Sequence, residues 1–265
     1  MPKQRLDSLL AERGLFSSRS RAAASVMAGE VRVGAGRRRA AKPGELVEMD
    51  AAVSVEERPA FVSRGGIKLA NALAGLELTP AGRRVLDVGS STGGFSDCLL
   101  QRGALEVIAV DVGYGELDWK LRSDPRVHVL ERTNARSLAP QMLPYVPDLA
   151  VIDVSFISLS KVLPAVLGCM TARHDVLALV KPQFEVGRER VGKGGVVRDA
   201  DHRRDALLSV AAAAHELGAA VLAFRSSGLP GPKGNRETFI WLAEAQRAGA
   251  AAPAGFERLA REVEP

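Results

Sequence analysis

The sequence contains few cysteines and no long apolar run. Its two cysteines, Cys98 and Cys169, lack the spacing of a metal site or a disulfide framework, so we expect free thiols in a reducing compartment. No stretch approaches the roughly 18 to 20 apolar residues that a membrane-spanning helix needs. The N-terminal MPKQRLDSLLAERG also lacks the apolar core of a secretory signal. These absences favour a cytoplasmic protein with no bound metal and no membrane partner.

Positive charge is concentrated near the N-terminus. Residues 1–42 contain ten Lys or Arg and three acidic residues, a balance of +7 in a chain whose net charge is +5, so the remainder carries −2. A small basic part joined to a nearly neutral larger one indicates a polyanionic partner that contacts one end of the protein. A basic surface that is merely solvated is the alternative interpretation.

The length of 265 residues allows a large and a small domain. Residues 1–58 have the pattern of a compact α+β unit, in which RLDSLLAERG and RSRAAASVMAGE predict two helices and VRVGAGRRRAAKPGELVEM predicts short strands and turns. A linker follows around EERPAF, which we place at residues 59–62. Residues 63–265 are then expected to form the larger domain.

The larger domain contains seven strand-like apolar runs. They are residues 83–89, 106–112, 127–132, 148–155, 175–181, 220–225 and 237–243. Helical patterns separate the earlier runs, which predicts parallel neighbours. Only LPGPKGN and its flanks separate the last two, too few residues for a helix, so we expect the final strand to be antiparallel. This α/β pattern, a mostly parallel seven-stranded sheet with an antiparallel last strand, resembles the class I (Rossmann-like) methyltransferase fold.

Charged residues end four of these runs: Asp87 in VLDVG, Asp111 in VIAVD, Asp153 in AVIDVSF and Lys181 in VLALVKP. For any single one, a polar residue that simply ends a strand is an adequate explanation. In open α/β sheets, however, ligands bind outside the carboxyl ends of parallel strands. Four charges in succession therefore predict a site at that edge of the sheet.

Chain topology brings two further charges to the same edge. Glu237 begins the antiparallel final strand, so it should lie beside the ends of the parallel strands. Lys68 lies near the start of a helix that must run down the sheet before the first strand begins. The sequence therefore predicts that Lys68, Asp153, Lys181 and Glu237 converge.

The turn after the first run, DVGSSTGGF, is not the G-x-G-x-x-G pattern that seats a pyrophosphate. Its glycines still permit close backbone approach. A ligand without phosphate, such as S-adenosylmethionine, suits this turn better than NAD. Asp111, at the end of the second run, is where a carboxylate would bind the ribose hydroxyls of an adenosyl ligand.

Two resemblances extend this interpretation. In the basic segment, R-L-D-x-L-L, S-R-S-R-A, G-E-V-R-V and K-P-G-E-L-V resemble the S-four RNA-binding domain. This resemblance implies that Arg5, Arg19, Arg21 and Arg32 contact RNA. The runs SRGGIKL, DVGSSTGGFSDCLL, DVSFISL, LVKPQFEVG and LPGPKGNRETFIWL resemble the TlyA family, and that match covers almost the whole chain. Members of that family are known as haemolysin A-like proteins and as ribosomal RNA 2′-O-methyltransferases, and combine an S-four domain with an FtsJ-type catalytic domain.

The family resemblance implies 2′-O-methylation of ribose in ribosomal RNA, with S-adenosylmethionine as cofactor and cytidine in 16S or 23S rRNA as the target. It implies a catalytic tetrad of Lys68, Asp153, Lys181 and Glu237. The implied cofactor contacts are Asp87, Gly89, Ser90, Ser91, Thr92, Gly93, Gly94, Phe95, Asp111, Asn134 and Asp153. Our hypothesis places Lys181 beside the 2′-oxygen, where it would stabilise the developing charge and could accept the proton. Lys68 would be a second cation, and the two acids would orient the lysines.

Two other functions remain open at this point. One is a membrane-active haemolysin, although the sequence contains no basic amphipathic helix with a broad aromatic face. The other is a non-catalytic RNA-binding assembly factor, for which an intact tetrad would be unnecessary. The basic, glycine-rich residues 186–204 form either a loop that closes on RNA or a plain surface loop. The oligomeric state is not predicted.

Overall fold

The computed structural model describes residues 2–55 and 59–264, which form two compact units, Met1–Pro59 and Ala60–Pro265. Of the segment EERPAF, residues 56–58 lie outside the described residues. Residues 60–62 pack on the larger unit: Phe61 is buried, the Val62 N–H donates to Asp97 Oδ2 at 2.9 Å, and the Ala60 carbonyl accepts from Gln101. The end of the expected linker therefore contacts the larger unit.

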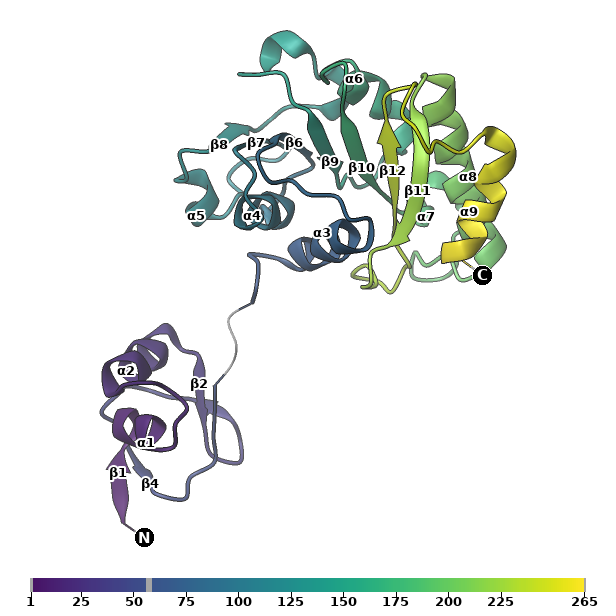
Figure 1. Cartoon of the computed structure of the whole chain (residues 1–265). Helices are drawn as coiled ribbons and strands as arrows, with labels where there is room; N and C mark the ends of the chain where they lie inside the picture. The colour runs from purple at the N-terminus through teal and green to yellow at the C-terminus, as the bar shows by residue number, and fades with distance from the viewer. Residues whose placement is uncertain (1, 56–58, 265) are drawn as a thin grey trace. The chain divides into compact units, whose positions relative to one another are not determined.

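In the smaller unit, described residues 2–55 form two helices and five short strands (Figure 1). They are β1 Lys3–Arg5, α1 Leu6–Glu12, α2 Arg19–Ala28, β2 Val31–Val33, β3 Arg38–Arg39, β4 Leu46–Glu48 and β5 Val53–Val55. Strand β1 pairs with β4, and β2 lies between β3 and β5. Leu6, Leu9 and Leu10 of α1 pack with Val26 and Val31 in its core. The leucine spacing seen in the sequence thus places one apolar helix face inward.

The larger unit contains a seven-stranded sheet. Its strands are β6 Arg84–Val88, β7 Glu106–Val110, β8 Val127–Leu130, β9 Leu149–Ile152, β10 Asp175–Val180, β11 Ala220–Ser226 and β12 Thr238–Ala243. Their order is β11-β12-β10-β9-β6-β7-β8. Strand β12 is antiparallel to both β10 and β11, whereas β10, β9, β6, β7 and β8 are parallel. All seven predicted strands, the antiparallel last strand and the class I methyltransferase fold are confirmed.

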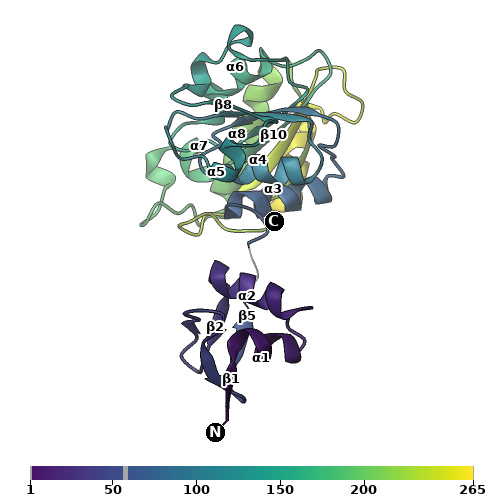
Figure 2. The same cartoon turned by 90° about the vertical axis from the view of Figure 1, so that its left-hand side faces the viewer.

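Helices cover both faces of this sheet (Figures 1 and 2). They are α3 Arg64–Gly75, α4 Gly94–Gln101, α5 Trp119–Arg122, α6 Leu163–Leu167, α7 Pro182–Glu185, α8 Ala200–Glu216 and α9 Phe256–Val263, with short 3-10 turns between them. One core packs α3, α4 and α5 on the sheet, and a second packs α6, α8 and α9 on its other face. Because both faces of the sheet are buried, the sequences of its strands are nearly continuous apolar runs. The sequence did not predict α9.

No helix in residues 2–55 or 59–264 is long and apolar enough to cross a membrane.

Candidate active site

The four charged residues expected to converge form two ion pairs in the larger unit. Lys68 Nζ lies 2.5 Å from Glu237 Oε2, and Lys181 Nζ lies 2.6 Å from Asp153 Oδ1. Lys181 also donates to Ser155 Oγ at 3.0 Å. Lys68, Lys181 and Glu237 are all buried, and the Asp153 side chain is 24% exposed. Each cation therefore has an acidic partner in a largely solvent-excluded place, where electrostatic interactions are strong.

Sheet topology explains why these side chains meet. Asp153 directly follows β9, and Lys181 directly follows the neighbouring strand β10. Glu237 directly precedes β12, whose first residue, Thr238, is registered against Val180. The antiparallel last strand thus begins where β10 ends, and Lys68 reaches the same edge from α3.

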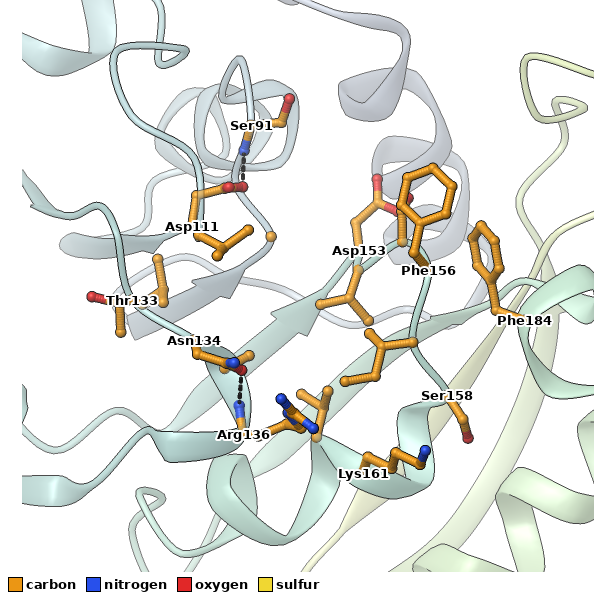
Figure 3. Close-up of a pocket in the computed structure, with 18 of the residues that line it drawn as sticks. Ser91, Asp111, Thr133, Asn134, Arg136, Asp153, Phe156, Ser158, Lys161 and Phe184 are labelled. Atoms are coloured by element: carbon orange, nitrogen blue, oxygen red, sulfur yellow. Dashed lines mark hydrogen bonds between the residues drawn. The ribbon is translucent and has the colours of Figure 1, made fainter.

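Two hollows meet at this edge. The smaller, a cavity of about 410 Å³, is lined by Lys68, Asp153, Lys181, parts of the turn Gly89–Phe95, and residues from the start of α3. The larger, a cleft of about 1070 Å³, contains Asp111 and Asn134 (Figure 3). Gly89, Ser91, Asp153 and Ser155 line both hollows. The small cavity and the large cleft are therefore adjacent, with Asp153 at their junction.

The turn after β6 depends on its first glycine. Gly89 has φ +86°, and a Cβ at this position would lie 2.6 Å from the backbone oxygen of Asp153. Only glycine fits both the conformation and the space. The carboxylate of Asp111 holds the turn further on, because it accepts the N–H of Ser91 at 2.8 Å (Figure 3). It also accepts the N–H of Gly113, after β7, at 2.7 Å. A carboxylate has about four acceptor positions, so Asp111 retains acceptor capacity for a ligand.

The residues expected to contact the cofactor differ in whether they line one of the two hollows. Those that line a hollow are Gly89, Ser90, Ser91, Thr92, Gly94, Phe95, Asp111, Asn134 and Asp153. Asp87 and Gly93 line neither the small cavity nor the large cleft. Gly93 has φ +94° at the start of α4, where Leu117 and Leu121 pack against it.

Asp87 does not lie at the end of its strand, where the sequence placed it. Strand β6 continues to Val88, so the two-residue alternation of the strand turns Asp87 toward α4. There it is fully buried and accepts the hydroxyl of Ser96 at 2.6 Å, while its Oδ1 has no hydrogen-bond donor among the described residues. Burial raises the pKa of this carboxyl to about 7, the Ser96 hydrogen bond lowers it, and the nearby Asp153 charge raises it. Asp87 thus lies beneath the turn.

An aromatic pair in the large cleft was not predicted from the sequence. Phe156 is 91% exposed and has φ +64°, and its ring centroid lies 5.3 Å from that of Phe184 (Figure 3). A bulky residue at positive φ is unusual and often marks a functional site. The sequence feature that could have indicated Phe156 is its position three residues after Asp153, in the run DVSFISL. An exposed ring beside a site offers a surface on which a base can stack.

The arginines expected to contact RNA all lie in the smaller unit. Arg5 ends β1, Arg19 and Arg21 lie in the first turn of α2, and Arg32 is the middle residue of β2. Arg5 and Arg19 share a buried ion-pair partner, Asp7.

The segment 186–204 has more order than a plain loop. It contains a 3-10 turn at Arg188–Arg190, a β-bridge between Gly192 and Val196, and the start of α8. Buried Asn235 accepts the Val197 N–H at 2.9 Å and donates to the Gly195 carbonyl at 2.7 Å. This segment is therefore tied to the loop that leads into Glu237. Within the described residues, no group of three or more His, Cys, Asp or Glu side chains is placed to hold a metal.

Comparisons with known proteins agree with this geometry. A family model described as FtsJ-like methyltransferase matches residues 61–244, and an S4 domain model matches residues 4–50. The chain belongs to the FtsJ-like methyltransferase family and is a methyltransferase with an S4 domain ahead of its catalytic fold. Within that family it is a member of the TlyA proteins.

Three relatives support the assignment. The 16S/23S rRNA (cytidine-2′-O)-methyltransferase TlyA of Mycobacterium tuberculosis is 50% identical over 242 residues, which span 91% of this chain and 90% of the relative. Hemolysin A of Brachyspira hyodysenteriae is 36% identical over 88% of this chain and 97% of its own length. A solved structure of a Streptococcus thermophilus protein that carries the name hemolysin matches with a TM-score of 0.73 and 40% identity, over 99% of this chain and 96% of that one.

Proposed function

We propose that this protein transfers a methyl group from S-adenosylmethionine to the 2′-hydroxyl of a ribose in ribosomal RNA. The observation that carries the proposal is the pair of buried ion pairs, Lys68–Glu237 and Lys181–Asp153, whose lysines line the small cavity and whose Asp153 lies where that cavity adjoins the large cleft. The name of the Mycobacterium tuberculosis relative suggests cytidine in 16S and 23S rRNA as the target. Such a substrate implies a cytoplasmic site of action.

The large cleft fits an adenosyl cofactor. The open turn at Gly89 allows close backbone approach, and Asp111 presents a carboxylate with remaining acceptor positions at the end of β7. Asn134, whose side chain accepts the Arg136 N–H, lies further along the same cleft (Figure 3). When bound, the cofactor supplies a methyl group already activated on a sulfonium. The protein must then bring the acceptor oxygen into line and stabilise its charge.

The small cavity suits the acceptor ribose. Lys181 can stabilise negative charge that develops on the 2′-oxygen and take up the proton that this oxygen loses as the methyl bond forms. Asp153 together with Ser155 fixes the direction of its amino group. Glu237 likewise fixes the direction of the ammonium group of Lys68, the second cation. Because each lysine is paired, the two cations can share one cavity without strong mutual repulsion. Low solvent exposure strengthens these interactions and keeps competing water away from the acceptor.

We further propose a division of labour along the chain. Residues 1–58 would bind RNA through Arg5, Arg19, Arg21 and Arg32, residues 59–62 would link the domains, and residues 63–265 would catalyse methyl transfer. The S4 domain match and the excess of basic residues before position 43 support this division.

Methyl transfer to unmodified RNA tests the proposal. Purified protein, tritiated S-adenosylmethionine and 16S and 23S rRNA transcribed in vitro, or ribosomal subunits assembled from them, should give tritiated RNA. The label should map to a ribose 2′-oxygen, seen as a site resistant to alkaline cleavage. Label on a base, or no label on any ribosomal RNA or subunit, would contradict the proposed function.

A further inference from the structure

A carboxylate lies buried beneath two of the arginines expected to contact RNA. Asp7, in the first turn of α1, is 3% exposed. It accepts from Arg5 at two positions, Nε at 3.1 Å and Nη2 at 2.8 Å, and it lies 3.1 Å from Nε of Arg19. The backbone N–H of Ser8 donates to it at 2.9 Å, and the Ser8 hydroxyl lies 3.5 Å away. One buried anion therefore binds two guanidinium groups from different elements.

Both guanidinium groups remain accessible while they are held. The side chain of Arg5 is 47% exposed and that of Arg19 is 57% exposed, whereas that of Asp7 is 4% exposed. Arg5 engages Asp7 through one edge of its planar group, which leaves donors on its other edge, and Arg19 is bound through a single nitrogen. The hydrogen bonds from Arg5 lower the pKa of the Asp7 carboxyl to about 2. The anion therefore persists at any physiological pH.

We propose that Asp7 is a positioning residue for RNA binding, which holds Arg5 and Arg19 in a preformed pair that engages adjacent phosphates. The inference rests on the proposed function, because it requires an RNA substrate. A free arginine side chain loses substantial rotamer entropy when it is fixed on a ligand. If Asp7 orders both side chains while the chain folds, binding RNA does not have to order them. Asp7 thus contributes to affinity for a polyanion although its own charge has the same sign.

The direction of the effect of Asp7→Asn on RNA affinity distinguishes positioning of the arginines from simple electrostatics. If only net charge mattered, Asp7→Asn would bind RNA more tightly, because one negative charge near the phosphates disappears. If Asp7 positions the arginines, the same change binds RNA more weakly. Glu12→Gln is the matched control, since Glu12 lies exposed at the end of the same helix and contacts neither arginine. It removes one negative charge and should tighten binding slightly.

The experiment measures binding of the full-length variants to in vitro transcribed 16S and 23S rRNA at several salt concentrations. For Asp7→Asn we expect Kd to rise about tenfold, and the slope of log K against log salt to become shallower by about one. In methyl transfer, KM for RNA should rise while kcat at saturating RNA stays the same. Unchanged or tighter binding by Asp7→Asn would overturn the inference. Failure of the wild-type chain to bind either RNA would instead refute the proposed function.

A double-mutant cycle excludes a merely structural role. In an Arg5→Gln/Arg19→Gln background there is nothing left to position, so Asp7→Asn should no longer weaken binding. Loss of affinity in that background as well would mean that Asp7 acts by supporting the fold, and would overturn the inference.

A second measurement needs no variant at all. In the RNA-free wild-type protein, the Nε–H NMR signals of Arg5 and Arg19 should show slow exchange and high order parameters, unlike Arg21, which does not contact Asp7. Fully averaged signals from Arg5 and Arg19 would also refute it.

Discussion

Four side chains contributed by separate elements form the proposed catalytic centre. Lys181 is the most constrained of them, because it lies between the end of buried strand β10 and Pro182, which restricts its backbone. Its ammonium contacts Asp153 and Ser155, which fixes its direction. A group held in this way can stabilise charge that appears only during the reaction.

Substitution of Lys181 should therefore affect chemistry more than binding. We expect Lys181→Ala and Lys181→Arg to keep cofactor and RNA affinity within a few-fold and to lose at least about 100-fold in kcat, because the group acts chiefly in the transition state. Arginine keeps the positive charge, but it cannot accept a proton and its planar head has a different reach. Tritium transfer to rRNA measures this. Lys120→Ala is the matched control, because Lys120 is also paired with an aspartate, Asp97, at 3.0 Å but lines neither hollow. Activity retained by Lys181→Arg alone would support a purely electrostatic role, and near-normal Lys181→Ala turnover would exclude this lysine from catalysis.

Asp87 predicts a specific dependence of stability on pH. Its pKa is raised by burial from an ordinary value of 3.8 to about 7 in the folded chain. Between these values the unfolded chain loses the proton while the folded chain keeps it. Stability must therefore fall as pH rises from about 4 to about 7, and Asp87 adds no further change above that window.

Asp87→Asn removes this titration and keeps the shape of the side chain. We expect the Tm of the variant to exceed that of the wild type by about 5 °C or more at pH 8 and to be nearly equal at pH 4. Calorimetry at both values provides the measurement. A Tm difference that does not change with pH would contradict the raised pKa.

Loops position the proposed catalytic charges as much as strands do. Gly89 allows the turn after β6 to pass against the backbone of Asp153. On the other side of the site, Asn235 ties residues 195–197 to the loop that enters β12 at Glu237, and its own carbonyl accepts the Gly231 N–H at 2.8 Å. Buried hydrogen bonds of this kind hold a loop in one conformation.

Removal of the Asn235 side chain should loosen both segments. We expect Asn235→Ala to speed hydrogen exchange at the Val197 amide at least about tenfold, because that donor loses its acceptor. Methyl transfer should fall about tenfold as Glu237 and Lys68 lose their alignment. Asn235→Asp can still accept from Val197 but cannot donate to Gly195, so it should give an intermediate result. Unchanged exchange at Val197 in the Ala variant would show that the loop is held by other contacts.

The whole molecule combines two units with different chemistry. The larger unit contains both hollows and all four charged residues of the tetrad. The smaller unit has its own apolar core, and the first 42 residues of the chain carry a net charge of +7. Each unit therefore has the packing needed to fold as a separate body.

Deletion of residues 1–58 tests this separation. We expect the shortened chain to bind S-adenosylmethionine as the full chain does, measured by calorimetry, and to lose at least about 100-fold in kcat/KM on ribosomal RNA. The full chain should also lose RNA affinity steeply as salt rises, because phosphate contacts release counterions. A shortened protein that methylates rRNA at the full-length rate would refute the division of labour.

The sequence by itself determined the sheet, its antiparallel last strand and the convergence of Lys68, Asp153, Lys181 and Glu237. These follow from local patterns, because apolar runs specify buried strands and connection lengths specify their directions. Once directions are known, the edge at which each strand ends is known too.

Only the tertiary structure decided which acid pairs with which lysine, because partners distant in sequence are chosen by packing and register. It likewise decided that Asp87 lies beneath the turn, because Asp87 shares the face of β6 on which α4 packs. Phe156 and Asn235 were not predicted from the sequence either. An exposed ring at positive φ and a buried amide between two loops have no periodic signal in the sequence, and their environment exists only in the folded chain.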